Sequence, residues 1–215
     1  MPVEYENDVN LVAVAEQRLG AARGHEDFVL FWNEGGLGAA LVLGGRLHRG
    51  WTGGAGEVGF LPVPGAPLVR QVTKANSGGY QELAGSQAVP RLARELGIAP
   101  IPSGPYAEVA AALLERAAAE DTDLSRRLLQ TYATRLATGL AALVSVLDPE
   151  LVVLSGASLT SGGERLRSLV QDELEELAAA RPRLVIGDVR EHPVLRGALE
   201  SALAATRDEV FDTSR

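Results

Sequence analysis

The chain has 215 residues, of which 46% are apolar and 22% are charged, an ordinary balance for a globular protein with a buried core. Its formal net charge of −8, without a basic patch or stripe, argues against direct contact of this chain with nucleic acid. It contains no cysteine, which excludes disulfides and thiolate metal sites.

The first residues contain neither the basic segment nor the apolar run of a secretory signal. The apolar runs at 136–147 and 151–154 are too short or too interrupted to cross a bilayer. We therefore expect a soluble, cytoplasmic protein without membrane contact.

The first 50 residues are typical of one helix followed by three short antiparallel strands. Asn7 or Asp8 is the expected N-cap of the helix and Gly20 its stop. Glu34-Gly35-Gly36 separates two apolar runs and is a hairpin signal. The elements expected here are a helix at 7–19 and strands at 27–32, 37–43 and 46–48.

The rest of the chain alternates between helical and strand patterns. Pro90 is expected to divide a helical segment into two. The continuously apolar run at 151–154 predicts a strand buried on both faces. The further elements expected are helices at 79–96, 106–119, 124–147, 164–180 and 197–210, and a strand at 183–189. This alternation predicts a single α/β domain.

Residues 33–82 are unusually rich in glycine, and the lone acids Glu57 and Glu82 lie within them. Glycine is favoured where the backbone needs a positive φ or approaches another group closely. One interpretation is a set of hairpin turns with a long mobile loop, and the other is a ligand site. Composition alone leaves both open.

Four segments in order resemble the ROK family of repressors, open reading frames and sugar kinases. Residues 6–10 (Glu-Asn-Asp-Val-Asn) resemble its E-N-D-x-N signature, and residues 36–47 resemble its G-I-G-A-G-I-V-x-x-G-x-L segment. Residues 54–59 (Gly-Ala-Gly-Glu-Val-Gly) are similar to G-x-A-G-E-I-G, and residues 148–156 to D-P-x-x-I-V-L-G-G.

The resemblance implies an α/β fold with an actin-like, ribonuclease-H-like lobe, in which helices pack on a mixed β-sheet. The aspartate matching Asp8 is the general base of the family's kinases, which takes a proton from a sugar hydroxyl. By the same resemblance, the expected sugar-binding residues are Asn7, Asp8, Gly56, Glu57 and Glu82. The expected nucleotide-side positions, taken as vestigial here, are Gly36, Gly38 and Gly156.

Two departures from the family pattern concern metal and phosphate. The family's zinc ligands correspond here to Phe60, Thr73, Ala75 and Tyr80, so no metal site and no zinc is expected. Phe60 and Tyr80 are expected to hold the loop by packing instead. Glu34 begins the turn that is G-T-G in the kinases, and a carboxylate there repels a triphosphate.

The expected function is sugar-effector binding in the kinase-like domain of a ROK transcriptional regulator, without catalysis and without a cofactor. The whole chain is expected to be the C-terminal domain, with residues 1–20 as the inter-lobe helix and with the winged helix-turn-helix and first lobe absent. One alternative is a sugar kinase that uses ATP and Mg²⁺ without zinc, with Asp8 as its base. Another is an oligomerisation module. The expected partners are a small sugar and a second copy in a homodimer, with no DNA contact by this chain.

Overall fold

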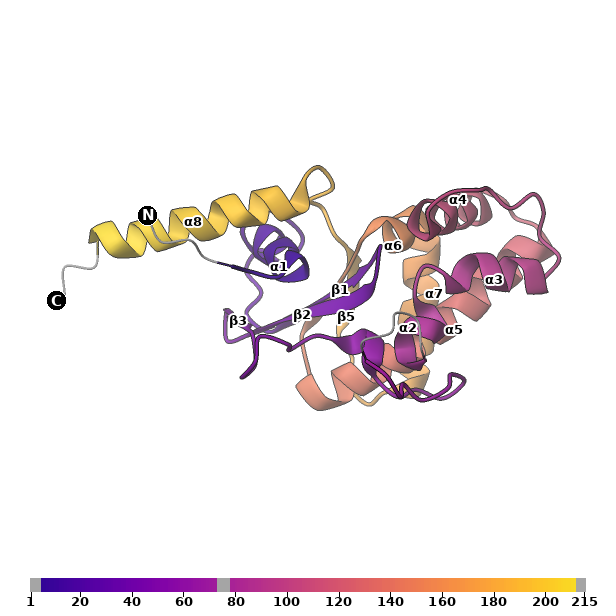
Figure 1. Ribbon diagram of the computed structural model, residues 1–215, viewed down its shortest axis with the longest axis horizontal. Coiled ribbons are helices and arrows are strands. Elements are labelled where there is room, and N and C mark those ends of the chain that lie inside the picture. Colours follow the sequence, from indigo (N-terminus) through magenta and orange to yellow (C-terminus); the bar gives the residue numbers. More distant parts are fainter. Residues whose placement is uncertain (1–4, 73–77, 212–215) are drawn as a thin grey trace.

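A mixed five-stranded sheet forms the centre of the computed structural model, which describes residues 5–72 and 78–211 (Figure 1). The strand order is β3-β2-β1-β4-β5. β1 pairs antiparallel with β2 and parallel with β4, so the hairpin start and the later α/β part share one sheet. The strands are β1 (Phe28–Asn33), β2 (Leu37–Leu43), β3 (Arg46–His48), β4 (Leu151–Ser155) and β5 (Arg183–Ile186).

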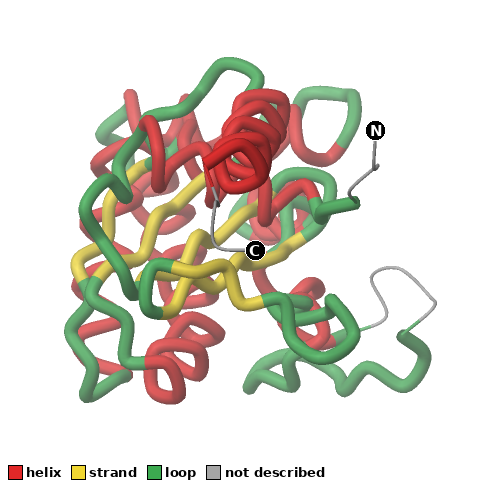
Figure 2. The backbone as a smooth tube through the Cα atoms, turned by 90° about the vertical axis from the view of Figure 1, so that its left-hand side faces the viewer, coloured by secondary structure: helices red, strands yellow, loops and turns green. Residues whose placement is uncertain are grey.

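Helices enclose the sheet, and Figure 2 shows the strands in yellow as one layer between them. On one face lies α1 (Asp8–Leu19), and α8 (Pro193–Phe211) packs across α1. This crossing is close, because a Cβ at Gly197 would lie 1.7 Å from the carbonyl oxygen of Leu11. The other helices are α2 (Gly79–Ala84), α3 (Ala88–Glu95), α4 (Tyr106–Ala119), α5 (Asp123–Leu147), α6 (Ala157–Ser161) and α7 (Gly163–Leu177).

The alternation of side chains along β1 separates two apolar layers. Phe28 and Leu30 belong to the layer beneath α1, whereas Val29 and Phe31 belong to the larger layer that includes α5 and α7. All four side chains are buried. β4 is buried along its whole length, as its continuous apolar run predicts.

Most predicted elements are confirmed, and the differences have local causes. The segment 79–96 does divide in two, but the break lies at 85–87, and Pro90 lies in the first turn of α3. A proline is tolerated there because its missing N–H has no partner in the first turn of a helix. The short α6 and the 3₁₀ turn Val58–Phe60 are absent from the prediction, and α8 begins earlier than predicted, with Pro193 at its first position.

The apolar stripe of α5 is buried within the chain. Leu128, Tyr132, Leu136 and Leu140 are all at most 1% exposed and lie in the larger apolar layer. This stripe therefore packs inside the chain.

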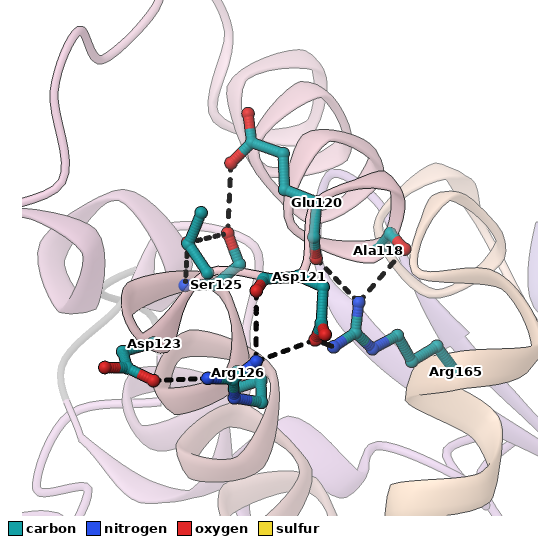
Figure 3. A network of polar contacts seen from close by, with 8 residues as sticks. Ala118, Glu120, Asp121, Asp123, Ser125, Arg126 and Arg165 are labelled. Carbon is teal, nitrogen blue, oxygen red and sulfur yellow. Dashed lines mark hydrogen bonds and ion pairs between the residues drawn. The ribbon is translucent and has the colours of Figure 1, made fainter.

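Two polar arrangements join elements that are distant in sequence. The carboxylate of Asp121 accepts hydrogen bonds from Arg126 of α5 and Arg165 of α7, each at 2.8 Å, which connects the α4–α5 loop to both helices (Figure 3). These bonds lower the pKa of Asp121, with Arg126 as the largest cause and Arg165 next. On the other face, the fully buried carboxylate of Glu16 in α1 accepts from the backbone of Ala21 at 2.8 Å and of Val189 at 2.9 Å.

None of the described helices combines the length and hydropathy that a membrane crossing needs.

Candidate functional site

The Glu-Asn-Asp-Val-Asn segment builds the amino end of α1. Asn7 is the N-cap: its side-chain oxygen accepts from the backbone N–H of Val9 at 2.8 Å. One carboxylate oxygen of Asp8 also accepts from Val9 at 2.8 Å. Glu6 accepts from Asn10 at 2.7 Å and from Arg49 at 2.6 Å. Glu6 and Asn10 thus fix the segment, and Asn7 and Asp8 remain exposed at its tip.

The glycine-rich loop after β3 brings Glu57 to the same place. Gly56 has φ of +93°, and a Cβ there would lie 1.9 Å from the carbonyl oxygen of Ala39. Its own carbonyl accepts from the backbone N–H of Ala39 at 2.9 Å. Only glycine permits this approach, which anchors the loop on β2. The side chain of Glu57 makes no capping hydrogen bond and is exposed.

The tip of α1 and the loop that carries Glu57 line one cavity of about 320 Å³. Of the residues predicted for sugar binding, Asn7, Asp8, Gly56 and Glu57 line it. Gly36 and Gly38, predicted for the nucleotide side, line this smaller cavity as well.

Glu82 lines neither this cavity nor a larger cavity beside it. It lies half-buried in α2, with a carboxylate oxygen 3.7 Å from the guanidinium of Arg91. The guanidinium of Arg91 also donates to the carbonyl of Glu82 at 2.5 Å. A role for Glu82 in sugar binding stays a prediction.

A larger cavity of about 780 Å³ adjoins the smaller one, and the two share Asp8 and Trp32. Gly156 lines the larger cavity, at the turn from β4 to α6. Its φ is +88°, and a Cβ there would lie 2.6 Å from the carbonyl oxygen of Asn33, so this turn packs tightly on the end of β1. Arg190 and His192 line the cavity from the loop before α8.

Two acidic residues, Asp8 and Glu34, line the larger cavity. Glu34 lines the larger cavity, and burial together with the neighbouring charge of Asp8 raises the pKa of Glu34. The sequence indicates Glu34 as a departure in the phosphate turn, whereas Trp32 was not predicted as a site residue. The available signal for Trp32 was its position at the carboxyl end of a strand, where ligands of α/β sheets bind.

Tyr80 packs in the core, as predicted for this position. Tyr80 is fully buried, its ring centroid lies 5.7 Å from that of Phe31, and its hydroxyl donates to the carbonyl of Leu136. The prediction that Phe60 also packs is wrong, because its side chain is 41% exposed. Thr73 and Ala75 lie outside the described residues. Within 5–72 and 78–211, no three His, Asp or Glu side chains are grouped so as to hold a metal ion.

The comparison with known families decides the classification, because the family model described as ROK family matches residues 1–205. The chain belongs to the ROK family. Its mixed sheet with flanking helices is the actin-like fold of solved ROK proteins.

Three relatives show the range of ROK proteins that this chain resembles. The bifunctional enzyme NanE/NanK of Brucella suis biovar 1 (strain 1330) is 36% identical over 156 residues, covering 72% of this chain and 26% of that protein. The ROK hexokinase from Thermus thermophilus has a TM-score of 0.76 at 30% identity, with 96% of this chain and 67% of that chain covered. A ROK transcriptional regulator described as a homologue of the E. coli MLC protein also has a TM-score of 0.76, at 24% identity, with 94% and 52% covered.

These ROK relatives include both kinases and a regulator, so likeness alone does not separate the two roles. The chain spans about a quarter of the NanE/NanK protein and 52–67% of the two solved chains. The activity of a whole ROK protein is therefore not assigned to this chain by similarity.

Proposed function

We propose that this chain is the sugar-sensing domain of a ROK transcriptional regulator and that it does not catalyse phosphoryl transfer. The observation that carries the proposal is the smaller cavity, where Asn7, Asp8 and Glu57 meet. Its volume of about 320 Å³ lies at the lower end of the range for small-molecule pockets, roughly 300–1,000 Å³.

The chemistry of these groups suits a polyol. An ionised carboxylate accepts hydrogen bonds through two oxygens, so it can take two neighbouring hydroxyls at once. Within the described residues, no side chain donates a hydrogen bond to Glu57, and Asp8 uses one oxygen on the backbone of Val9. Both carboxylates therefore keep acceptor capacity toward the cavity.

The carboxylate of Glu34 disfavours a triphosphate beside Asp8, whereas Arg190 supplies a positive charge elsewhere in the lining of the larger cavity. Glu34 lines the larger cavity, and when ionised it adds a second negative charge close to Asp8. A phosphoryl donor needs positive charge or amide donors where its negative charge develops. We propose that the site acts without ATP, magnesium or zinc.

The second candidate is a zinc-free sugar kinase, and the position of Asp8 favours it. Asp8 lines both cavities, which is where a general base between a sugar and a phosphoryl donor would lie. A coupled assay of sugar-dependent ADP release separates the candidates. Turnover that Asp8→Asn abolishes would establish the kinase and overturn the sensing proposal.

We further propose that the chain acts as a homodimer, within a longer regulator whose DNA-binding module is a separate winged helix-turn-helix. The acidic balance of this chain supports a separate DNA-binding module, since the net charge is −8. Residues 1–20 would then connect this domain to the preceding lobe.

Calorimetry tests the sensing proposal directly. We expect one or more of glucose, mannose, N-acetylglucosamine and N-acetylmannosamine to bind, and Glu57→Ala to weaken that binding about 10- to 100-fold, since a hydrogen bond to a charged group contributes about 1.5–3 kcal/mol. Glu176→Ala is the matched control, because Glu176 is exposed on α7, away from both cavities. The absence of binding heat for every sugar would contradict the proposal, as would equal affinities for the Glu57 variant and the wild type.

A further inference from the structure

Trp32 lies at the boundary between the two cavities because of its place in the sheet. At the carboxyl end of β1, it pairs with Gly38 of β2 on one side and with Ser155 of β4 on the other. Gly38 lines the smaller cavity and Ser155 the larger one. The end of β1 is therefore the partition between them, and Trp32 is the large side chain that this partition carries.

Trp32 is the largest apolar side chain among the described residues that line the smaller cavity. Among the described residues that line it, Trp32 is the one aromatic side chain. Apart from Val9 and Leu37, the others are glycines, alanines or polar residues. The carboxylates and the indole thus offer two different kinds of contact.

The indole is held in place from behind. Trp32 is half-buried and packs against the apolar layer beneath α1, which also contacts Val9 and Val194. Because that packing restricts its movement, a ligand meets a preformed surface and loses little side-chain entropy on binding.

We propose that Trp32 is a specificity-determining residue of the sugar site, whose indole covers the apolar C–H face of a pyranose. This inference rests on the proposed function and names the contact that selects the ligand. A sugar ring has hydroxyls at its edge and C–H groups on its faces. Asp8 and Glu57 accept from the edge, and the aromatic ring covers a face, as is usual in pockets where a few polar groups orient a ligand against apolar walls.

The tryptophan content of the chain permits a direct test. The chain has two tryptophans, and the other one, Trp51, is fully exposed at 101% and lines neither cavity. In Trp51→Phe, the fluorescence reports on Trp32 alone. We expect a sugar that binds by calorimetry to shift its emission to shorter wavelength and to reduce its quenching by acrylamide about twofold, since the ligand excludes water from the indole.

Two substitutions test whether an aromatic side chain is needed at position 32. We expect Trp32→Ala to weaken the binding of that sugar about tenfold or more, and Trp32→Phe to stay within about threefold of the wild type, a gap of about threefold or more between the two variants. Glycerol and sorbitol, which have hydroxyls but no ring face, serve as probes that should not respond to Trp32→Ala. Thermal melts by circular dichroism check that each variant is folded, and the Trp32 fluorescence of Trp51→Phe keeps the test valid if Trp32→Ala is not.

The results distinguish this inference from the proposed function. Sugar binding by calorimetry with unchanged Trp32 fluorescence and wild-type affinity of a folded Trp32→Ala would overturn the role of Trp32 and leave sugar sensing intact. The absence of binding heat for every sugar on the wild-type chain would overturn both. Shielding of Trp32 by a sugar, lost in Glu57→Ala at the same concentration, would support both.

Discussion

The carboxylate of Glu34 lies in surroundings that disfavour its ionised form. It is partly buried in the larger cavity wall and lies near Asp8, and both effects raise its pKa. Its backbone carbonyl, in contrast, is well satisfied by the hydroxyl of Ser86 at 2.8 Å. The turn therefore holds an acid where its ionised form is disfavoured, which is common at binding sites and uncommon at purely structural ones.

The pKa of Glu34 predicts a pH-dependent gain of stability in Glu34→Gln. Because the folded-state pKa is raised, the stabilising contribution of the protonated acid is complete below the unfolded-state pKa and is lost as pH rises through the folded-state pKa. The neutral amide does not suffer this loss, so the variant should melt at a higher temperature than the wild type at pH 7.5, and the gap should close near pH 4. Calorimetric melts at both pH values measure it, with Glu176→Gln as an exposed control. An equal gap at both pH values would refute the explanation.

Between α2 and α5, the aromatic ring of Tyr80 fills the space above a glycine. The ring of Tyr80 lies over Gly139, where an added Cβ would lie 2.3 Å from the ring atoms. Alanine is normally favoured over glycine inside a helix by about 1 kcal/mol. Here the ring cannot move easily, because it is fully buried between Phe31 and α5.

Gly139→Ala should therefore destabilise the chain, although helix propensity alone predicts the opposite. We expect a net loss of about 1–2 kcal/mol in the free energy of unfolding, since overpacking costs about 1–3 kcal/mol and the propensity gain offsets part of it. Urea denaturation measures the change. Ser145→Ala on the exposed side of the same helix should be neutral or slightly stabilising. A stabilised Gly139→Ala would show that the ring is free to shift.

The elements were predictable where their signals are local. The cap at Asn7 and the hairpin at Glu34-Gly35-Gly36 depend on residues within a few positions of one another, and both are confirmed. The break in 79–96 was attributed to Pro90, but the helix ends before the proline, with Gly85 as its C-cap. Contacts between segments that are distant in sequence could not be predicted. The carboxylate of Glu16, for example, accepts a hydrogen bond from a backbone N–H 173 residues away.

The candidate site follows the same division. The motif resemblance indicated Asn7, Asp8, Gly56 and Glu57, and the structure brings these four to one cavity. The partition at Trp32 depends on the pairing of β1 with β4, two strands separated by more than a hundred residues, which no spacing within the sequence reveals. Glu82 has the right residue type in a matching motif, yet its carboxylate lies 3.7 Å from the guanidinium of Arg91, on the next helix.

At the scale of the whole molecule, α8 presents an apolar stripe that no other described part of the chain covers. Leu195, Leu199 and Leu203 recur at a spacing of four and are 67%, 58% and 41% exposed, respectively. Figure 1 shows α8 (yellow) lying across α1 and extending past the sheet. Isolated exposed leucines are ordinary, but a helical stripe of them is typical of an interaction surface.

This stripe gives the proposed homodimer a specific test. We expect Leu199→Glu combined with Leu203→Glu to raise the dissociation constant of the dimer by about a hundredfold or more, because each leucine buried at an interface contributes about 1.5–3 kcal/mol and a symmetric interface loses each one twice. Light scattering over a concentration series measures the change, and far-ultraviolet circular dichroism should be unaltered, since both side chains are exposed. Leu177→Glu at the end of α7, where the leucine is also exposed, is the matched control and should leave the dimer unchanged. A wild-type chain that stays monomeric at every concentration, or a dimer that survives both substitutions on α8, would show that this stripe does not join two copies.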